Sequence, residues 1–359
     1  MQKKYPIGIL GATGMVGQRY IQLLENHPWF EVVWLAASDR SSGKTYGEAA
    51  KWRLDSPLPD RIASMTVAPA EPDAAAAANQ PAPKIIFASI DAAIARELEP
   101  KFAAAGHAVI SNSSAFRMAP NVPLVLPEVN ASHLSLIEEQ SWRKASGGYI
   151  VTNSNCTVMG PVLALKPIQD RFGIEQIFAI SMQAVSGAGY PGVASMDILD
   201  NVVPYIANEE EKMEEELLKL LGKLDGHTVT PLAARMSATC NRVPVVDGHT
   251  VCLSIKLAKP ATREEILAAW ADFRPLAGQG LPTAPDQPVQ WAPQPDRPQP
   301  RLDRYRGNGM AVTVGRLRPC GLLDWKFIVL SHNTIRGAAG ATILNAELLA
   351  SLGKLEPVA

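Results

Sequence analysis

The sequence predicts an α/β fold class in two parts: a doubly wound parallel sheet, followed by an α+β domain whose mixed sheet is largely antiparallel. In the first 150 residues, short apolar segments alternate with helical patterns, which is typical of a parallel sheet covered by helices on both faces. In the second half, apolar and polar residues alternate along longer segments, as in antiparallel strands with one polar face.

Apolar runs and turn residues mark the expected strands and helices of the first half. Helical spacing of apolar residues between Val16 and Leu24 ends before Pro28. The Pro- and Ala-rich stretch 69–83 predicts a loop with a helical turn. We expect strands at 5–10, 31–37, 84–88, 107–111 and 149–152, and helices at 16–24, 92–98 and 101–105.

The second half is expected to contain strands at 176–184, 250–256 and 311–317 and an amphipathic helix at 209–221. Residues 282–300 hold seven prolines in 19 residues and predict an extended surface connection in which Val289 and Trp291 are buried. An Ala- and Gly-rich segment, 333–352, predicts a long closing helix.

Composition excludes several classes of protein. The 359 residues suffice for about two domains, and 47% hydrophobic with 19% charged residues indicates a folded chain. A formal net charge of −1 argues against nucleic-acid and anionic-membrane binding, and no run of 18 apolar residues predicts a membrane span. The four cysteines form no C-x-x-C pair, so we expect no disulfide framework and no metal site. Reduced cysteines favour the cytoplasm.

A glycine-rich turn, Gly11-x-x-Gly14-x-x-Gly17, lies between the first expected strand and helix. In this context such a turn brings backbone N–H groups close to a pyrophosphate at a helix N-terminus, so the first domain is predicted to be of Rossmann type. The second strand ends without the usual acidic residue, and Ser38, Arg40 and Ser41 suit a 2′-phosphate. We therefore favour NADP, although the adjacent Asp39 keeps NAD open.

Cys156 follows the expected strand at 149–152 and precedes an apolar segment, which places it at a strand-to-helix turn. A helix N-terminus lowers the pKa of a thiol and favours the nucleophilic thiolate. Cys240, Cys252 and Cys320 are interpreted as small buried residues. Pattern alone does not favour His249 over His332 as a partner for the thiol.

Several further motifs occur in order along essentially the whole chain. They are GATGMVG (11–17), SNSSAFRM (111–118), SNCT (154–157), QAVSGAGYPG (183–192), NEEEKM (208–213), CNRVPVVDGH (240–249) and HNTIRGAAG (332–340). Together they resemble the aspartate-semialdehyde dehydrogenase family, in the branch typical of archaea and fungi. The resemblance implies NADPH-dependent reductive dephosphorylation of 4-aspartyl phosphate to aspartate 4-semialdehyde, which supplies lysine, methionine and threonine synthesis.

The resemblance also implies roles for individual residues. Cys156 would form a thioester, and His249, with a near-neutral pKa, would act as acid and base. A substrate α-carboxylate suits an Arg fork and an α-ammonium suits a carboxylate. The implied catalytic residues are Cys156, His249, Gln183 and Asn155; the substrate-binding residues are Arg242, Glu209, Lys212 and Arg117. The cofactor-binding residues are Gly11, Thr13, Gly14, Met15, Val16, Gly17, Ser38, Arg40, Ser41, Ser186, Gly187 and Asn333.

The family also implies discontinuous domains, with 1–152 and 333–359 binding the dinucleotide and 153–332 forming the catalytic and dimerisation domain. A homodimer or homotetramer is expected. Apart from Glu209 and Lys212, the acidic run at 209–216 is interpreted as a solvated helix start.

Three alternative functions compete with the one that the resemblance implies. A malonyl-CoA reductase would use the same fold and thioester chemistry but has no ammonium for Glu209 to bind. N-acetylglutamyl phosphate reductases are less similar in SNSSAFRM and CNRVPVVDGH. A non-catalytic NADP-binding protein is expected to lack Cys156, His249 or Arg242, all of which are present.

Overall fold

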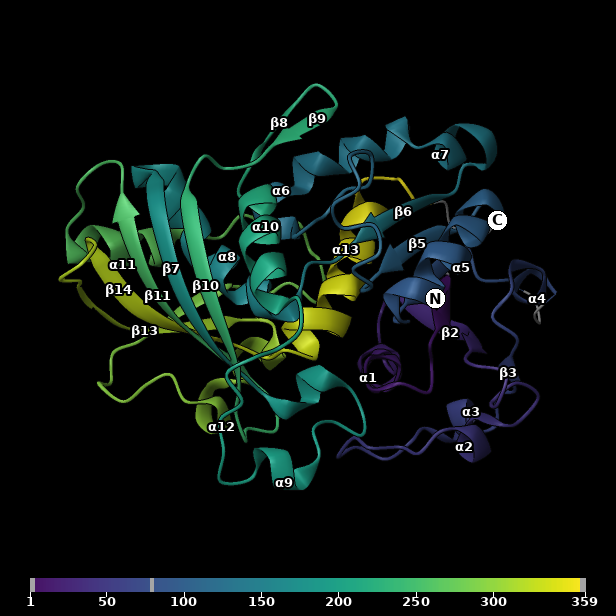
Figure 1. Ribbon diagram of the computed structural model, residues 1–359. Helices are drawn as coiled ribbons and strands as arrows, with labels where there is room; N and C mark the ends of the chain where they lie inside the picture. Colours follow the sequence, from purple (N-terminus) through teal and green to yellow (C-terminus); the bar gives the residue numbers. More distant parts are fainter. Residues whose placement is uncertain (1–3, 78–80, 356–359) are drawn as a thin grey trace. The chain divides into compact units, whose positions relative to one another are not determined.

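The computed structural model describes residues 4–77 and 81–355, which form two compact units (Figure 1). The first unit comprises Met1–Val125, Ser132–Asn153 and Ala339–Ala359, and the second comprises Leu126–Ala131 and Ser154–Ala338. Residues 78–80 of the expected 69–83 loop lie outside the described ranges. Within those ranges, no helix has both the length and the apolar character needed to cross a bilayer.

The sheet of the first unit has the strand order β3-β2-β1-β4-β5-β6, and every pairing in it is parallel. This is the strand order of doubly wound dinucleotide-binding folds, so the predicted fold class is confirmed for this unit. The strands are β1 (Tyr5–Leu10), β2 (Phe30–Ala36), β3 (Val67–Ala68), β4 (Ile85–Ala88), β5 (Ala108–Ser111) and β6 (Tyr149–Thr152).

Right-handed crossovers place α1 (Met15–Leu24) and α5 (Ala92–Ala104) on opposite faces of this sheet. The sequence predicted a break near Pro100, but α5 continues through it. Buried Glu99, Phe102 and Ala103 hold this segment on the sheet, which offsets the backbone hydrogen bond that proline removes. Shorter helices are α2 (Tyr46–Ala49), α3 (Asp60–Ala63), α4 (Pro72–Ala76), η1 (Ala131–Glu139) and α7 (Ser141–Ser146).

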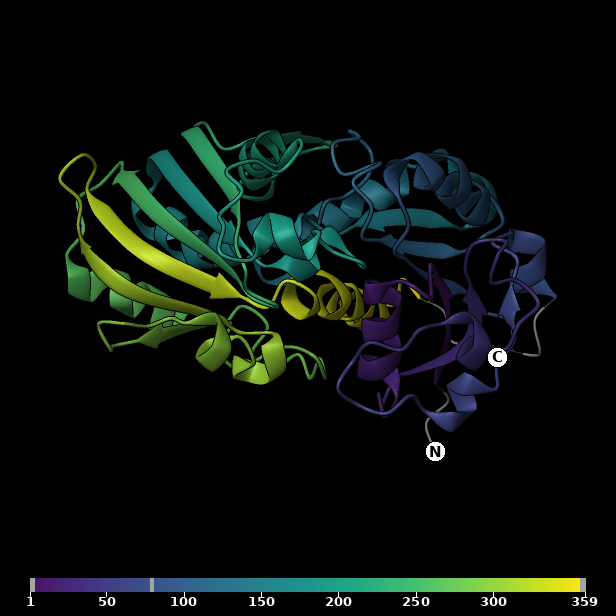
Figure 2. The same cartoon turned by 60° about the horizontal axis from the view of Figure 1, so that its bottom comes forward.

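The C-terminal helix α13 (Gly340–Ser351) belongs to the first unit, where it lies beside α1 (Figure 2). The hydroxyls of Tyr20 and Thr342 are 2.8 Å apart, and His27 Nε2 lies 2.8 Å from Glu347 Oε1. The closing helix starts later than predicted, because residues 335–339 form a π-helical turn, η4 (Ile335–Ala339), before the regular helix.

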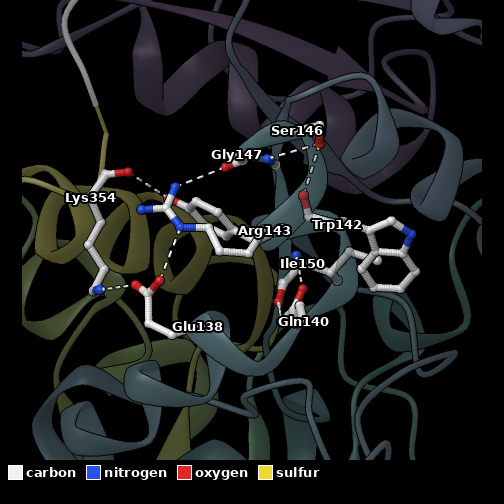
Figure 3. Close-up of polar contacts among 10 residues, drawn as sticks. Glu138, Gln140, Trp142, Arg143, Ser146, Gly147, Ile150 and Lys354 are labelled. Carbon is white, nitrogen blue, oxygen red and sulfur yellow. Dashed lines mark hydrogen bonds and ion pairs between the residues drawn. The ribbon is translucent and has the colours of Figure 1, made fainter.

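Beyond α13 the chain is fastened to the same unit by polar contacts (Figure 3). Lys354 Nζ lies 2.7 Å from Glu138 Oε1, and the buried Tyr149 hydroxyl donates to the Lys354 carbonyl at 3.1 Å. Arg143 bridges Glu138 and the Gly147 carbonyl. The described part of the C-terminus is therefore fixed to the amino end of β6.

Glu99 is a buried carboxyl group inside the first unit, hydrogen-bonded by the Ser111 hydroxyl. Burial raises the pKa of Glu99 from 4.5 to about 7, while Ser111 and the positive charge of Arg117 act in the opposite direction. The unfolded chain releases this proton near pH 4.5 and the folded chain near pH 7, so this group reduces stability as the pH rises between those values.

We expect Glu99→Gln to stabilise the protein above pH 7, because glutamine needs no proton to stay neutral and its oxygen still accepts from Ser111. The advantage over wild type should grow by about 3 kcal/mol between pH 4 and pH 8. Urea unfolding at both pH values measures it. Glu97→Gln, at an exposed position of the same helix, is the control. A pH-independent difference would contradict the prediction.

The second unit contains a mixed sheet in the order β10-β7-β11-β14-β13-β12. Three of its five pairings are antiparallel, between β7 and β11, β11 and β14, and β14 and β13, which confirms the predicted sheet type. The strands are β7 (Ile174–Gln183), β10 (Arg235–Arg242), β11 (His249–Leu257), β12 (Val289–Ala292), β13 (Val312–Pro319) and β14 (Trp325–Ser331), with a separate hairpin of β8 (Lys223–Asp225) and β9 (Thr228–Thr230).

Part of this sheet was not predicted. β14 lacks a clear alternation, whereas β10 alternates polar and apolar residues but was not predicted. β12 lies inside the proline-rich stretch that was expected to be an extended connection. Val289 and Ala292 are fully buried there, and Trp291 stacks on Trp270 with ring centroids 6.0 Å apart. β12 itself contains no proline, because Pro288 and Pro293 lie just outside it, and it pairs with β13 as the edge strand of the sheet.

One face of the second sheet is covered by α8 (Cys156–Phe172) and α11 (Arg263–Asp272). The opposite face carries exposed apolar side chains, including Phe178 at 43% and Ile180 at 36% exposure. The outer edge of β10 is covered by α10 (Glu209–Leu220). The remaining short helices are α6 (Pro127–Asn130), η2 (Val185–Ala188), α9 (Ser195–Ile198), α12 (Pro300–Asp303) and η3 (Arg306–Gly309).

Candidate active site

The glycine-rich turn of the first unit has the close packing expected of a phosphate cradle. Gly11 has a φ of +87°, and a Cβ at this position would lie 2.4 Å from the Ser89 carbonyl oxygen. A Cβ on Gly17 would lie 2.4 Å from the Gly11 carbonyl oxygen, so the helix can approach the turn only with glycine there. Gly14 caps α1 without a side-chain hydrogen bond, which leaves the first turn open to an anion.

The turn that follows β2 lies beside this cradle, because the Gly11 and Ala12 amides both donate to the Ala36 carbonyl at 2.9 Å. Ser38 and Arg40 are exposed, while Ser41 closes the turn through its amide on the Ser38 carbonyl. The hydroxyl and guanidinium groups of this turn fit a 2′-phosphate, so the first unit's residues suit NADP.

Cys156 is the first residue of α8. Asn155 is the N-cap, and its side-chain oxygen accepts a hydrogen bond from the Thr157 amide at 2.7 Å. A thiol at this position faces the positive end of the helix dipole, which stabilises a thiolate. The local geometry predicted for Cys156 is therefore present.

His249, the first residue of β11, lies next to the thiol, with Nε2 3.3 Å from Cys156 Sγ. Its Nδ1 accepts the Ala184 amide at 3.1 Å, so the neutral ring carries its proton on Nε2, facing the sulfur. Complete burial, and then the charges of Arg242 and His332, lower the pKa of His249 to about 3. The near-neutral pKa expected from the sequence is thus wrong for this structure, and His249 is suited to donate a hydrogen bond to a thiolate.

Arg242 and Gln183 end two paired strands on the same side of the unit. Arg242 is buried and donates from Nη1 to the Ala184 carbonyl at 2.8 Å. Gln183 is fully buried, and its Oε1 has no hydrogen-bond partner among the described residues. An orphaned amide oxygen beside a buried guanidinium is typical of a site that completes its polar contacts with a ligand.

Helix α10 supplies the predicted Glu209 and Lys212. Asn155 Nδ2 donates to Glu209 Oε1 at 2.8 Å, and Lys212 Nζ lies 3.6 Å from the same oxygen. Glu209 and the N-cap of the nucleophile helix are therefore in direct contact. A carboxylate, an ammonium and a buried guanidinium within one unit can bind a substrate that carries charges of both signs.

In the rest of the acidic run, Glu211 and Glu215 are exposed as predicted, but the other three glutamates are not part of a solvated surface. Glu210 and Glu214 accept the outward-facing amides of Cys240 and Ala238 on β10, at 2.9 and 2.8 Å. Glu216 is buried, with an oxygen 2.6 Å from the Asn155 amide. The prediction failed because an amphipathic helix covers a strand edge whose free N–H groups need acceptors.

Two glycines frame the thiol and the imidazole. A Cβ on Gly187 would lie 2.9 Å from Arg242 Nη1 and 3.0 Å from His249 Cε1, and a Cβ on Gly337 would lie 2.7 Å from Cys156 Cβ. Gly337 sits in η4, next to a buried bidentate ion pair of Arg336 and Glu128 with both distances at 2.7 Å. This pair fixes the turn that packs against Cys156.

The second unit contains three residues predicted to bind the cofactor: Ser186, Gly187 and Asn333. Asn333 Nδ2 donates to the Ser186 hydroxyl at 2.8 Å, and Asn333 Oδ1 accepts the Gly248 amide at 2.8 Å. Ser186, Gly187 and Asn333 are therefore linked to the residue that precedes His249. Arg117 belongs to the first unit, where it is buried and donates to the Asn112 carbonyl at 2.6 Å.

Sequence reasoning missed Gly337, Glu216 and the backbone of Ala184. The HNTIRGAAG motif contains Gly337 and could have indicated it. Glu216 lies seven residues after Glu209 and so on the same helix face, which is a usable signal. A backbone amide such as that of Ala184 has no sequence signature.

Family models match both parts of the chain. The model described as "Semialdehyde dehydrogenase, NAD binding domain" matches residues 6–137, and that described as "Semialdehyde dehydrogenase, dimerisation domain" matches residues 165–336. An aspartate-semialdehyde dehydrogenase of Archaeoglobus fulgidus is 51% identical over 96% of this chain and 98% of the relative. The chain belongs to the aspartate-semialdehyde dehydrogenase family.

Other members of the family extend the match. The aspartate-semialdehyde dehydrogenase of Schizosaccharomyces pombe is 46% identical over 97% of this chain and 98% of its own. The crystal structure of the Candida albicans enzyme with NADP superposes with a TM-score of 0.89, at 42% identity and over 98% of this chain and 100% of that one. The resemblance seen in the sequence motifs is confirmed.

Proposed function

We propose that this protein catalyses NADPH-dependent reductive dephosphorylation of 4-aspartyl phosphate to aspartate 4-semialdehyde, a step in amino-acid biosynthesis in the cytoplasm. The observation that carries the proposal is the placement of Cys156 Sγ, 3.3 Å from His249 Nε2 at the first residue of α8. The charged groups of Arg242, Glu209 and Lys212, which suit an amino-acid phosphate, lie in the same unit.

In the proposed reaction, the Cys156 thiolate attacks the acyl carbon, the bond to the phosphate oxygen breaks, and a thioester forms on Cys156. His249 donates its Nε2–H first to the thiolate and then to the oxyanion that develops on the acyl carbon. Once the thioester carbon has gained a hydride, the resulting thiohemiacetal oxyanion collapses to the aldehyde and expels the thiolate. His249 needs no change of protonation in these steps, in keeping with its low pKa.

The substrate would be held by charge. Arg242 suits the α-carboxylate, Glu209 the α-ammonium, and Lys212 the phosphate. In the first unit, Arg117 is a further cation whose charge suits a phosphate. Asn155 and the Cys156 amide would serve as oxyanion donors, and the orphaned Oε1 of Gln183 would find its partner on the substrate.

In the first unit, the pyrophosphate of NADP would be held by Gly11, Thr13, Gly14, Met15, Val16 and Gly17, and its 2′-phosphate by Ser38, Arg40 and Ser41. In the second unit, Ser186, Gly187 and Asn333 are the residues proposed to bind the cofactor. When bound, NADPH supplies the hydride that reduces the thioester. The Gly11 and Gly17 positions support this fit, because any side chain there would fill the cradle.

The reverse reaction tests the function. Purified protein with aspartate semialdehyde, phosphate and NADP should form NADPH in a phosphate-dependent manner, and malonyl-CoA with NADPH is tested in parallel. The intact Glu209–Lys212 pair disfavours the malonyl substrate, which has no ammonium. Oxidation of NADPH with malonyl-CoA and no reaction with aspartate semialdehyde would contradict the proposal.

The assembly is proposed to be a homodimer through the open face of the second sheet, with a homotetramer as the larger alternative. That face carries exposed Phe178 and Ile180 and a groove of about 350 Å³ near Leu322, which is 95% exposed. Contiguous exposed apolar patches mark interfaces, and the matching family model is described as a dimerisation domain.

We expect Ile180→Glu to shift the protein towards a monomer, because a dimer would bury that charge without a partner. Analytical ultracentrifugation at micromolar concentration measures the change. Leu352→Glu, at an exposed apolar position of the first unit, is the matched control and should leave the assembly unaltered. A wild-type monomer, or an unchanged Ile180→Glu assembly, would contradict this interface.

A further inference from the structure

The turn before α8 determines where the Cys156 thiol lies. Asn155 occupies the N-cap, and both polar atoms of its side chain form hydrogen bonds. Its Oδ1 accepts from the Thr157 amide at 2.7 Å, and its Nδ2 donates to Glu209 at 2.8 Å. The backbone of Ser154 and Asn155 needs a separate support, because a displaced N-cap would displace the first helical residue with it.

That support comes from one oxygen of Glu216. Its Oε2 accepts the Asn155 amide at 2.6 Å and the Ser154 hydroxyl at 2.9 Å. Glu216, Ser154 and Asn155 are all buried. Two hydrogen bonds to one carboxylate oxygen in a buried environment restrain both residues of the turn, so they fix its geometry.

The same face of α10 carries the groups proposed to bind the substrate. Glu209, Lys212 and Glu216 are spaced by three and four residues and therefore point to one side of the helix. Glu209 and Glu216 contact the side chain and the backbone of Asn155, respectively. A single rigid helix thus holds both the substrate carboxylate partner and the turn that presents the thiol.

We propose that Glu216 is a positioning residue, which acts through the Ser154–Asn155 turn to hold Cys156 in register with His249 and with the substrate-binding face of α10. The inference rests on the function proposed above, in which Cys156 is the nucleophile. Glu216 would act on the thiol through these two residues, because its Oε2 accepts from the Ser154 hydroxyl and the Asn155 amide, which directly precede Cys156 in the chain.

Kinetics separate positioning from a merely structural role. Glu216→Ala removes the acceptor of two hydrogen bonds, and we expect kcat to fall about 100-fold with KM for aspartate semialdehyde within threefold, because small misplacements of a reacting group have effects of this size. Glu216→Gln keeps an oxygen that can accept both donors and should recover kcat to within about fivefold of wild type. Ser154→Ala removes one donor and should lower kcat about fivefold.

A second readout does not depend on turnover. The rate of iodoacetamide modification of Cys156, followed on the Cys156 peptide by mass spectrometry against pH, should fall in Glu216→Ala and be restored in Glu216→Gln. Glu214→Ala is the matched control: it lies on the same helix and accepts a backbone amide from Ala238 at 2.8 Å. It should change neither kcat nor the modification profile.

Several outcomes would overturn the proposal. One is a folded Glu216→Ala protein with kcat within threefold of wild type, and another is a Glu216→Gln variant as slow as Glu216→Ala. If Glu216→Ala does not fold, unchanged kcat and unchanged Cys156 modification in Ser154→Ala would overturn it. Retained turnover in Cys156→Ala would instead refute the proposed function, and the modification profile would still test the positioning of Cys156.

Discussion

Cys156→Ala should abolish phosphate-dependent NADPH formation, with kcat reduced by at least about 10⁴-fold, since the variant loses the thiol that lies beside His249 and is proposed to form the thioester. Cys156 is the first residue of α8, and Ala is a good helix former, so the fold should be retained. Titration of NADP binding by protein fluorescence should give an affinity within about threefold of wild type, because the phosphate cradle lies in the first unit.

The control for this experiment is a second cysteine. Cys320, like Cys252, is only partly buried, so the interpretation of these two as buried residues is wrong. Hydrogen bonds from the backbone N–H groups of Leu323 and then Leu322 lower the pKa of the Cys320 thiol, and we expect a thiol reagent to modify Cys320 as well as Cys156. Loss of activity after alkylation would therefore not identify the nucleophile. Cys320→Ala should keep full activity, and alkylation of that variant should still inactivate it. Turnover by Cys156→Ala above about 1% of wild type would show that the thiol is not essential.

Local features of the fold were predictable because they depend on residues close in sequence. Short patterns predict the need for glycine at positions 11 and 17, the alternation of strands and helices, and the position of Cys156 at a turn before a helix. β14 was missed because it lacks alternation and its position depends on pairing with β11, far away in the chain. Tertiary packing decided this strand, as it did the continuous helix through Pro100. β10 alternates polar and apolar residues, so a local signal for it was present in the sequence.

In the site, too, local features could be predicted and those that depend on tertiary packing could not. Cys156, His249 and Arg242 carry side chains whose chemistry can be recognised, and the structure links them through Ala184. The tautomer of His249 depends on a backbone amide, and its low pKa depends on burial; neither can be seen in the sequence. From composition alone, the glutamates of α10 were interpreted as solvated. Composition does not reveal that Glu214 lies against the edge of β10 and that Glu216 lies against the N-cap of α8.

Arg242→Leu should lower kcat/KM for aspartate semialdehyde by about 10³-fold, because the variant loses a buried cation proposed to bind the substrate carboxylate and leaves that charge unpaired. Arg242→Lys should lose about 10²-fold, since an ammonium cannot form the bidentate pair that a guanidinium forms. Steady-state kinetics with NADP and phosphate at saturation measure both effects.

The size of the effect follows from where Arg242 is held. Its Nη1 donates to the Ala184 carbonyl, while the amide of Ala184 fixes the His249 ring, so the guanidinium and the imidazole share one anchor. Gly187 packs against both groups and leaves no room for either to move towards it. Arg301→Leu, at an exposed position on α12, should leave kcat/KM unaltered. A loss of less than tenfold in Arg242→Leu would mean that another cation binds the carboxylate and that Arg242 mainly supports the loop around Ala184.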